Sequence, residues 1–163
     1  MNERAEGVSR NAYVTALRML ARRRLTEAQL WQRLERHGFP GGDVRAAVER
    51  CKRDGYVDDR LFARLHIEQK RRAIGDARLV GELVLKGVDR EAAYDALRES
   101  ESGETERIDA AIAKIFRTKP GISYASAARA MERLGFPASL IYRKLREHAA
   151  AFGPFAEAAT EDG

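Results

Sequence analysis

Cysteine and histidine are scarce in this sequence, which argues against disulfides and metal centres. A single cysteine, Cys51, occurs in 163 residues, so no internal disulfide can form, and this usage is typical of a reducing compartment. Cys51 lies at helical spacing from the apolar residues before it, which predicts a packed rather than a reactive side chain. The histidines are His37, His66 and His148. They share no metal-ligand spacing with Cys51, so we expect three separate surface histidines and no metal site.

Long hydrophobic runs and the motifs of common enzymes are also missing. No apolar stretch approaches the length of a membrane span, and residues 1–10 are polar and contain no signal-peptide core. The sequence has no Walker loop, dinucleotide fingerprint, nucleophile elbow or zinc signature. We therefore expect a soluble, cytoplasmic protein that is not an enzyme, uses no cofactor and has no membrane partner.

The most informative feature that is present is a repeat marked by three glycines. Gly38, Gly87 and Gly135 each follow a Leu or Met by four residues and precede a large apolar residue. Their spacings are 49 and 48 residues. A period of this size predicts an array of small helical units, each too small to bury its apolar face alone.

Each unit is predicted to contain three short helices. Residues 26–29 (Thr-Glu-Ala-Gln) match a capping box that begins the middle helix of the first unit, and Gly38 is placed to end that helix in the left-handed conformation. Gly75 and Ser123 stand at the place of Thr26 in the later units. No stretch alternates apolar and polar residues for long enough to predict a strand. The expected fold is all-α, with three tandem three-helix, helix-turn-helix-like repeats in an extended or curved array.

The turn signals also set the expected boundaries between units. We expect three-helix repeats at residues 9–56, 57–100 and 105–148. The acidic segment 101–104 is the expected linker, which would couple the second and third repeats less tightly. The Ala- and Glu-rich residues 149–163 are expected to form a disordered tail.

Charge is distributed unevenly over these units, although the net charge is only +5. Residues 1–56 contain twelve bases and seven acids, residues 57–104 nine and eleven, and residues 105–148 nine and four. Basic clusters recur near the end of each unit's first helix. We call these eight residues the basic ridge: Arg22, Arg23, Arg24, Lys70, Arg71, Arg72, Arg117 and Lys119. Each cluster could simply compensate a helix dipole, but the threefold recurrence favours contact with a polyanionic or acidic partner.

Several other residues have two possible roles each. Asp58 and Asp59 are expected to cap a helix rather than to act as an acid–base pair. Tyr56 is expected to pack back onto the preceding helix rather than to stack on a base. Trp31 could wedge between units or serve as an exposed anchor, and the sequence leaves these alternatives open.

Several motifs together carry a family resemblance, although none of them is decisive alone. Residues 55–63 read Gly-Tyr-Val-Asp-Asp-Arg-Leu-Phe-Ala, and supporting motifs occur at 17–23, 26–30 and 82–88. Their order and spacing over residues 12–148 resemble the RecX family, bacterial regulators of the recombinase RecA. The residues that match the family's junction between first and second repeats are Gly55, Tyr56, Asp58, Asp59 and Phe62.

The resemblance implies a function as well as a fold. It implies a monomer of three tandem repeats that lies along the groove of a RecA filament on DNA. It further implies inhibition of RecA, by capping filament growth or promoting disassembly, which restrains strand exchange and coprotease activity. Direct but weak binding to DNA is also implied.

The second repeat departs from the family pattern. Its middle helix, residues 75–85, is less basic than in other members, and Asp76 stands where proline is usual. This leaves open whether the face contacts phosphate or, through Val80, Val84 and Leu85, protein.

A helical-repeat DNA-binding module that acts without RecA is the rival hypothesis. In that case the last helix of a unit would read bases in the major groove. The final helices at residues 45–50 and 91–96 carry acids and alanines where Arg, Asn or Gln would read bases. This composition favours the RecA regulator.

Overall fold

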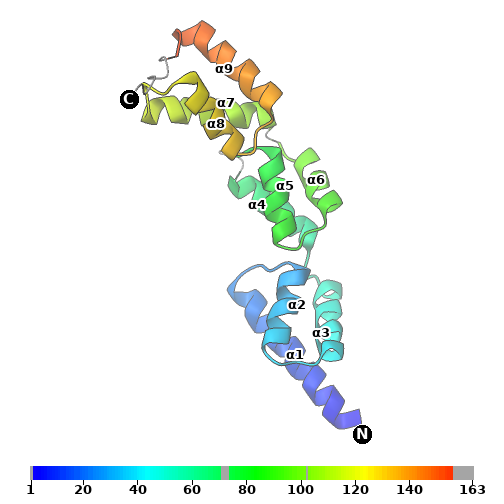
Figure 1. Ribbon diagram of the computed structural model, residues 1–163. Helices are drawn as coiled ribbons and strands as arrows, with labels where there is room; N and C mark the ends of the chain where they lie inside the picture. The colour runs from blue at the N-terminus through cyan, green and yellow to red at the C-terminus, as the bar shows by residue number, and fades with distance from the viewer. Residues whose placement is uncertain (1, 71–73, 102, 156–163) are drawn as a thin grey trace, which may run out of the picture. The chain divides into compact units, whose positions relative to one another are not determined.

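The computed structural model describes residues 2–70, 74–101 and 103–155, with side chains from residue 11 onward. Every regular element in these ranges is an α-helix (Figure 1). The helices are α1 (Asn2–Arg22), α2 (Glu27–Arg36), α3 (Gly41–Arg53), α4 (Asp59–Lys70), α5 (Asp76–Leu85), α6 (Arg90–Arg98), α7 (Glu104–Thr118), α8 (Tyr124–Arg133) and α9 (Ala138–Phe152). They form three consecutive sets of three, which confirms the predicted all-α class and repeat.

Local signals start the middle helices as predicted. The Thr26 hydroxyl accepts a hydrogen bond from the Gln29 amide, and the Gln29 side chain accepts one from the Thr26 amide, which completes the capping box of α2. Ser123 caps α8 in the same way through the amide of Ser126. These bonds satisfy backbone donors that the first turn of a helix otherwise leaves without partners.

The three repeat glycines end the middle helices in the left-handed conformation, also as predicted. Gly38, Gly87 and Gly135 have φ of 86°, 90° and 87°. In each case the residue after the glycine donates its amide to the carbonyl of the Leu or Met four residues before the glycine, as Phe39 does to Leu34 at 3.3 Å. This bond brings two apolar residues together across the helix end. It explains why, in every repeat, one apolar residue stands four positions before the glycine and another directly follows it.

Alanine substitution should separate two contributions of these glycines. Gly38→Ala should destabilise the protein by about 1 kcal/mol, because a side chain there is strained but enters open space. Gly87→Ala should cost more, because its new Cβ would lie 2.3 Å from the Cβ of Ala28. Urea denaturation of the two variants measures the difference, and equal losses would contradict it.

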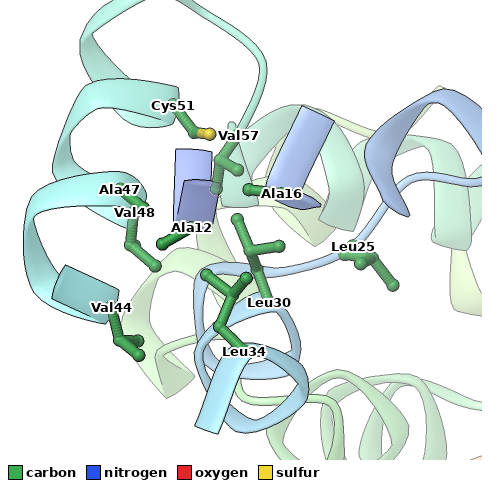
Figure 2. Close-up of a cluster of buried hydrophobic side chains, with 10 residues drawn as sticks. All are labelled: Ala12, Ala16, Leu25, Leu30, Leu34, Val44, Ala47, Val48, Cys51 and Val57. Atoms are coloured by element: carbon green, nitrogen blue, oxygen red, sulfur yellow. The ribbon is translucent and has the colours of Figure 1, made fainter. Parts of the chain in front are cut away.

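The chain forms two compact units. The first comprises the residues up to His66 together with Glu82–Arg98. In it α1, α2 and α3 pack on one another around buried side chains that Figure 2 shows converging between them. Cys51 lies in this core, and burial raises the pKa of its thiol to about 11. This confirms that Cys51 packs in the core, as predicted.

The second compact unit comprises Ile67–Gly81 and the residues from Glu99 onward. Its main core is formed by α7, α8 and α9, with Ile108, Met131 and Ile141 among the buried side chains. The division between the units therefore crosses α4 and α5 instead of following the ends of the second repeat. The repeat boundaries at 9–56, 57–100 and 105–148 stay predictions.

The helix ends differ from the expected limits in three places. Helix α1 begins at Asn2, before the expected start at residue 9. Helix α7 begins at Glu104, so residue 104 belongs to a helix and not to the linker. Helix α9 continues to Phe152 because three alanines, strong helix formers, follow His148. Phe155 then packs against Phe116 and Tyr124, so the expected disordered tail is ordered to this point, and residues 156–163 lie outside the described residues.

Candidate functional site

The basic ridge lies at exposed helix ends wherever the structure describes it. Arg22 is the last residue of α1, and Arg23 and Arg24 follow it, all exposed. Lys70 ends α4 and is exposed, and Arg117 and Lys119 are exposed at the end of α7. Arg71 and Arg72 lie outside the described residues. The positions suit favourable charge at helix C-termini, and contact with a partner stays a prediction.

The structure adds residues to this surface that the sequence did not single out. An open groove of about 850 Å³ lies between α1 and α2. Its lining residues are Thr15, Arg18, Met19, Arg22, Arg23, Arg33, Arg36 and His37. Among the described side chains, no carboxylate lines the groove and none of its five arginines forms an ion pair. The groove therefore concentrates positive charge, of which the ridge prediction included only Arg22 and Arg23.

A second basic groove, of about 680 Å³, lies between α7 and α8. It is lined by Ile115, Lys119, Pro120, Gly121, Ile122, Ser123, Ser126, Arg129, Ala130 and Arg133. Lys119 is a ridge residue, whereas Arg129 and Arg133 were missed. The signal that could have found them is the repeat itself, because Arg36 and Arg133 both stand two residues before a turn glycine.

The second repeat carries different residues at these places. Leu85 replaces Arg36 and Arg133, and its side chain is 88% exposed. Glu82 replaces Arg33, and its Oε2 lies 3.0 Å from Nε2 of His66. His66 is buried, so the expectation of a surface histidine was wrong here. The contact with Glu82 and the stacked ring of Phe62 provide an interior environment for the imidazole.

The acidic residues of the family-like junction act as caps. Asp58 accepts a hydrogen bond from the amide of Leu61 at 2.9 Å, which confirms its predicted capping role. Asp59 instead accepts from the amide of Glu27 at 2.9 Å, so it caps α2 of the preceding repeat. Burial raises the pKa of Asp59. The hydrogen bond between Asp59 and Glu27 therefore joins the first and second repeats.

An equivalent bond joins the next pair of repeats. Glu104, the first residue of α7, accepts a hydrogen bond from the amide of Asp76 at 2.8 Å, and burial raises the pKa of Glu104. The buried Arg107 pairs with the Asp76 carboxylate and donates to the carbonyl of Ile74 at 3.1 Å. Glu104 and Arg107 thus both bond Asp76 across this junction, and the looser coupling expected from the acidic linker stays a prediction.

A further hydrogen bond recurs at both junctions. The Thr26 hydroxyl donates to the carbonyl of Lys86 at 2.5 Å, and the Gly75 amide donates to the carbonyl of Leu134 at 2.8 Å. Each acceptor immediately precedes the turn glycine of the next repeat. Gly75 is required here, because an added Cβ would lie 2.3 Å from the carbonyl oxygen of Gly135.

Three aromatic residues have different environments. Tyr56 is 55% exposed, so the expectation that it packs was wrong; the neighbouring Val57 is buried in its place. Phe62 is half-buried beside His66. Trp31 is half-buried against the core of α1–α3, which makes it a packing residue of its own repeat.

Consecutive three-helix sets, joined by recurrent hydrogen bonds and carrying basic grooves, define an all-helical tandem-repeat protein. A model of the first three-helix domain of RecX matches residues 12–51. The regulatory protein RecX of a Thermus thermophilus strain is 33% identical over 126 residues, which cover 77% of this chain and 84% of that protein. The chain therefore belongs to the RecX family of regulatory proteins.

One other relative agrees with this assignment, and a solved structure shares the fold. The regulatory protein RecX of Syntrophotalea carbinolica is 43% identical over 70 residues, which span 41% of this chain and 46% of the relative. The crystal structure of RecX from Lactobacillus salivarius shares the fold, with a TM-score of 0.77 at 15% identity over 87% of this chain and 97% of that one.

Two further features of the described residues bear on possible sites. None of their helices combines the length and the apolar character that crossing a membrane requires. Within the same residues, no three His, Cys, Asp or Glu side chains lie together in a group that could hold a metal ion.

Proposed function

We propose that this protein binds the RecA filament on DNA and inhibits RecA, by blocking filament extension or by destabilising the filament. The effect would restrain strand exchange and coprotease activity during DNA repair and recombination. Membership of the RecX family carries this proposal, since its relatives are named as regulatory proteins.

The charge of the molecule supports the same partner. A protein filament on DNA presents phosphates, and the guanidinium group binds phosphates and carboxylates through a planar fork of donors. The arginines that line the α1–α2 groove and the exposure of the described ridge residues support contact with such a surface. Their attraction to the filament should fall as salt concentration rises, because salt ions compete for the same charges.

Titration into purified RecA on single-stranded DNA tests the proposal through the rate of ATP hydrolysis. We expect hydrolysis to fall as the protein is added. Inhibition well below one molecule per RecA subunit would indicate capping of filament ends, and inhibition near equal amounts would indicate binding along the filament. No change at any ratio would contradict the proposal and favour the rival, a helical-repeat module that binds DNA without RecA.

The basic grooves are the observation that supports this rival hypothesis, because they could bind DNA in the absence of RecA. The exposed residues of α3 include Ala46 and Glu49 beside three arginines, a mixture that does not by itself favour base recognition. The basic grooves favour a DNA interaction with phosphates, which would be independent of sequence.

A further inference from the structure

We infer that a notch between α5, α7 and α8 binds a small carboxylate with an apolar body, such as a short fatty acid or an aromatic acid. The notch has a volume of about 440 Å³, and all of its lining residues belong to the second compact unit. The inference goes beyond the proposed function, because it concerns a small ligand that this chain binds without RecA or DNA.

The floor of the notch is apolar. It is formed by side chains of α7 and α8 and of the residue that ends α8, namely Ala111, Ile115, Ala130, Met131 and Leu134. Two of them are buried in the core of the third repeat, and the other three are half-buried. A ligand whose apolar body covers this floor removes apolar surface from water, which favours binding. The volume lies within the range of pockets that take small molecules.

Three cationic side chains accompany this floor, each from a different helix. They are Arg78 of α5, Lys114 of α7 and Arg133 of α8. The Nη1 atom of Arg78 donates a hydrogen bond to the carbonyl of Arg133 at 3.1 Å, which holds the Arg78 guanidinium at the notch. Among the described side chains, no carboxylate lines the notch. Apolar and cationic side chains together are complementary to a molecule that is apolar at one end and anionic at the other.

The second repeat shows which anion suits this place. Lys114 and His66 each stand 21 residues before the turn glycine of their repeat. Ala130 and Glu82 each stand five residues before it. In the second repeat, the Oε2 atom of Glu82 lies 3.0 Å from Nε2 of His66. In the third repeat a lysine stands at the place of the histidine, but the facing residue is an alanine. A bound carboxylate therefore takes the place that the Glu82 carboxylate has in the second repeat.

The alanine also provides the room for a ligand. Arg33 and Glu82, which both have long side chains, stand at the place of Ala130 in the first and second repeats. Because Ala130 lines the notch, a longer side chain at this position would occupy part of its volume. The combination of a lysine with a facing alanine is thus what makes the third repeat suitable for a carboxylate from outside the chain.

The notch differs from the α7–α8 groove, although the two share Ile115, Ala130 and Arg133. A phosphodiester backbone has no apolar part to cover the floor of the notch. Among the described residues that line it none is aromatic, so it offers no ring on which a base could stack. Peptides usually bind at sheet edges or in long grooves, whereas a volume of about 440 Å³ suits a single small molecule. These features favour a small apolar carboxylate over a polymer.

Titration of the full-length, ¹⁵N-labelled protein with octanoate tests the inference by NMR, without RecA or DNA and below the concentration at which micelles form. We expect saturable shifts of the amides of Ala111, Ile115 and Ala130. Acetate has the carboxylate alone and 1-octanol the apolar chain alone. Each should bind at least about tenfold more weakly than octanoate. Equal binding of acetate would show that the floor contributes nothing, and equal binding of 1-octanol would show the same of the cations. Either result would overturn the inference.

The variant Ala130→Glu gives the third repeat the residue of the second. Its carboxylate should occupy the notch and weaken octanoate binding by at least about tenfold. The matched control is Ala113→Glu, which makes the same change at an exposed position of α7 outside the notch. Circular dichroism shows whether both variants keep their helical content. Equal losses in the two variants would overturn the inference, because they would show that only the net charge of the protein matters.

The variant Lys114→Gln tests the cation without filling the notch. It should also weaken octanoate binding, whereas Arg143→Gln, with the same loss of charge at an exposed position of α9, should bind octanoate like wild type. Wild-type affinity in Lys114→Gln would contradict the assignment of Lys114 as the partner of the carboxylate. A peptide of sequence Glu-Leu-Glu that shifts the same amides and binds more tightly than octanoate would overturn the choice of a small ligand.

Thermal unfolding provides a second readout of the same site. A ligand that binds only the folded protein raises the midpoint of unfolding as its concentration rises. Octanoate should therefore raise the midpoint of the wild-type protein and leave that of Ala130→Glu nearly unchanged. Equal increases in both proteins would show that octanoate binds elsewhere and would overturn the inference. Since RecA is absent from these experiments, their failure would leave the proposed function untouched.

Discussion

Replacing Arg22, Arg23 and Arg24 by glutamate should weaken binding to the RecA–DNA filament by more than about tenfold at low salt. The three side chains are exposed, and two of them line the α1–α2 groove, so their reversal places negative charge against the phosphates. The wild-type affinity should fall with rising salt, and the variant should show a shallower dependence. Co-sedimentation with filaments at several salt concentrations measures both effects.

The fold should survive this change. The buried residues Leu30 and Leu34 are untouched, and acids at the end of α1 should cost only a fraction of a kcal/mol to about 1 kcal/mol through the helix dipole. Arg45→Glu, Arg53→Glu and Arg90→Glu together provide a control with the same net charge at exposed positions away from the groove. A folded ridge variant that binds filaments like wild type, at both low and high salt, would show that these arginines only solvate the end of α1.

The second ridge cluster extends this prediction. Changing Lys70, Arg71 and Arg72 to glutamate should weaken filament binding in the same way if all repeats contact the filament. Wild-type binding by this variant would show that only the ridge clusters of repeats 1 and 3 contact the filament. The less basic character of repeat 2 would agree with that result.

Replacing Gly75 by alanine should destabilise the protein by about 1–3 kcal/mol, toward the upper part of that range. Its added Cβ would lie 2.3 Å from the carbonyl oxygen of Gly135 and 2.7 Å from the amide nitrogen of Phe136. Both are backbone atoms, so no side-chain rotation can relieve the clash. The hydrogen bond from the Gly75 amide to the Leu134 carbonyl would lengthen or break as the segments separate. Chemical denaturation followed by circular dichroism measures the loss.

Gly81→Ala is the matched control for this experiment. Gly81 lies in the middle of α5 on an exposed face with open space around its Cα. Alanine there should stabilise the protein by about 0.5–1 kcal/mol, because glycine is the poorer helix former. A Gly75→Ala variant as stable as wild type would show that the two repeats do not approach each other as closely as the structure indicates.

The sequence predicted the parts of this structure that depend on neighbouring residues. The capping box at Thr26, the cap at Ser123 and the left-handed Gly38 were all predicted, since each is a contact within a few residues of the chain. Repetition of these signals at nearly constant spacing then indicated three-helix units. Residues 149–155 were less well predicted, because the position of Phe155 depends on aromatic contacts that it makes with residues distant in the sequence.

The candidate site was predicted only in part for the same reason. Arg22 and Lys119 belong to basic clusters that are visible in the sequence, but Arg18 and Arg33 become part of a site only when α1 packs beside α2. Tyr56 was misassigned because its exposure depends on which neighbour enters the core.

By itself, the sequence determined the helical class, the period of the repeat, the starts of α2 and α8 and the glycine turns that end the middle helices. The tertiary structure alone decided that Asp59 and Glu104 cap helices of the preceding repeat, that Gly75 lies against Gly135, and that five arginines share one groove. The physical reason is distance along the chain. Caps and turns are settled by backbone geometry over a few residues, whereas junction bonds and grooves join residues from different helices and exist only after those helices have packed.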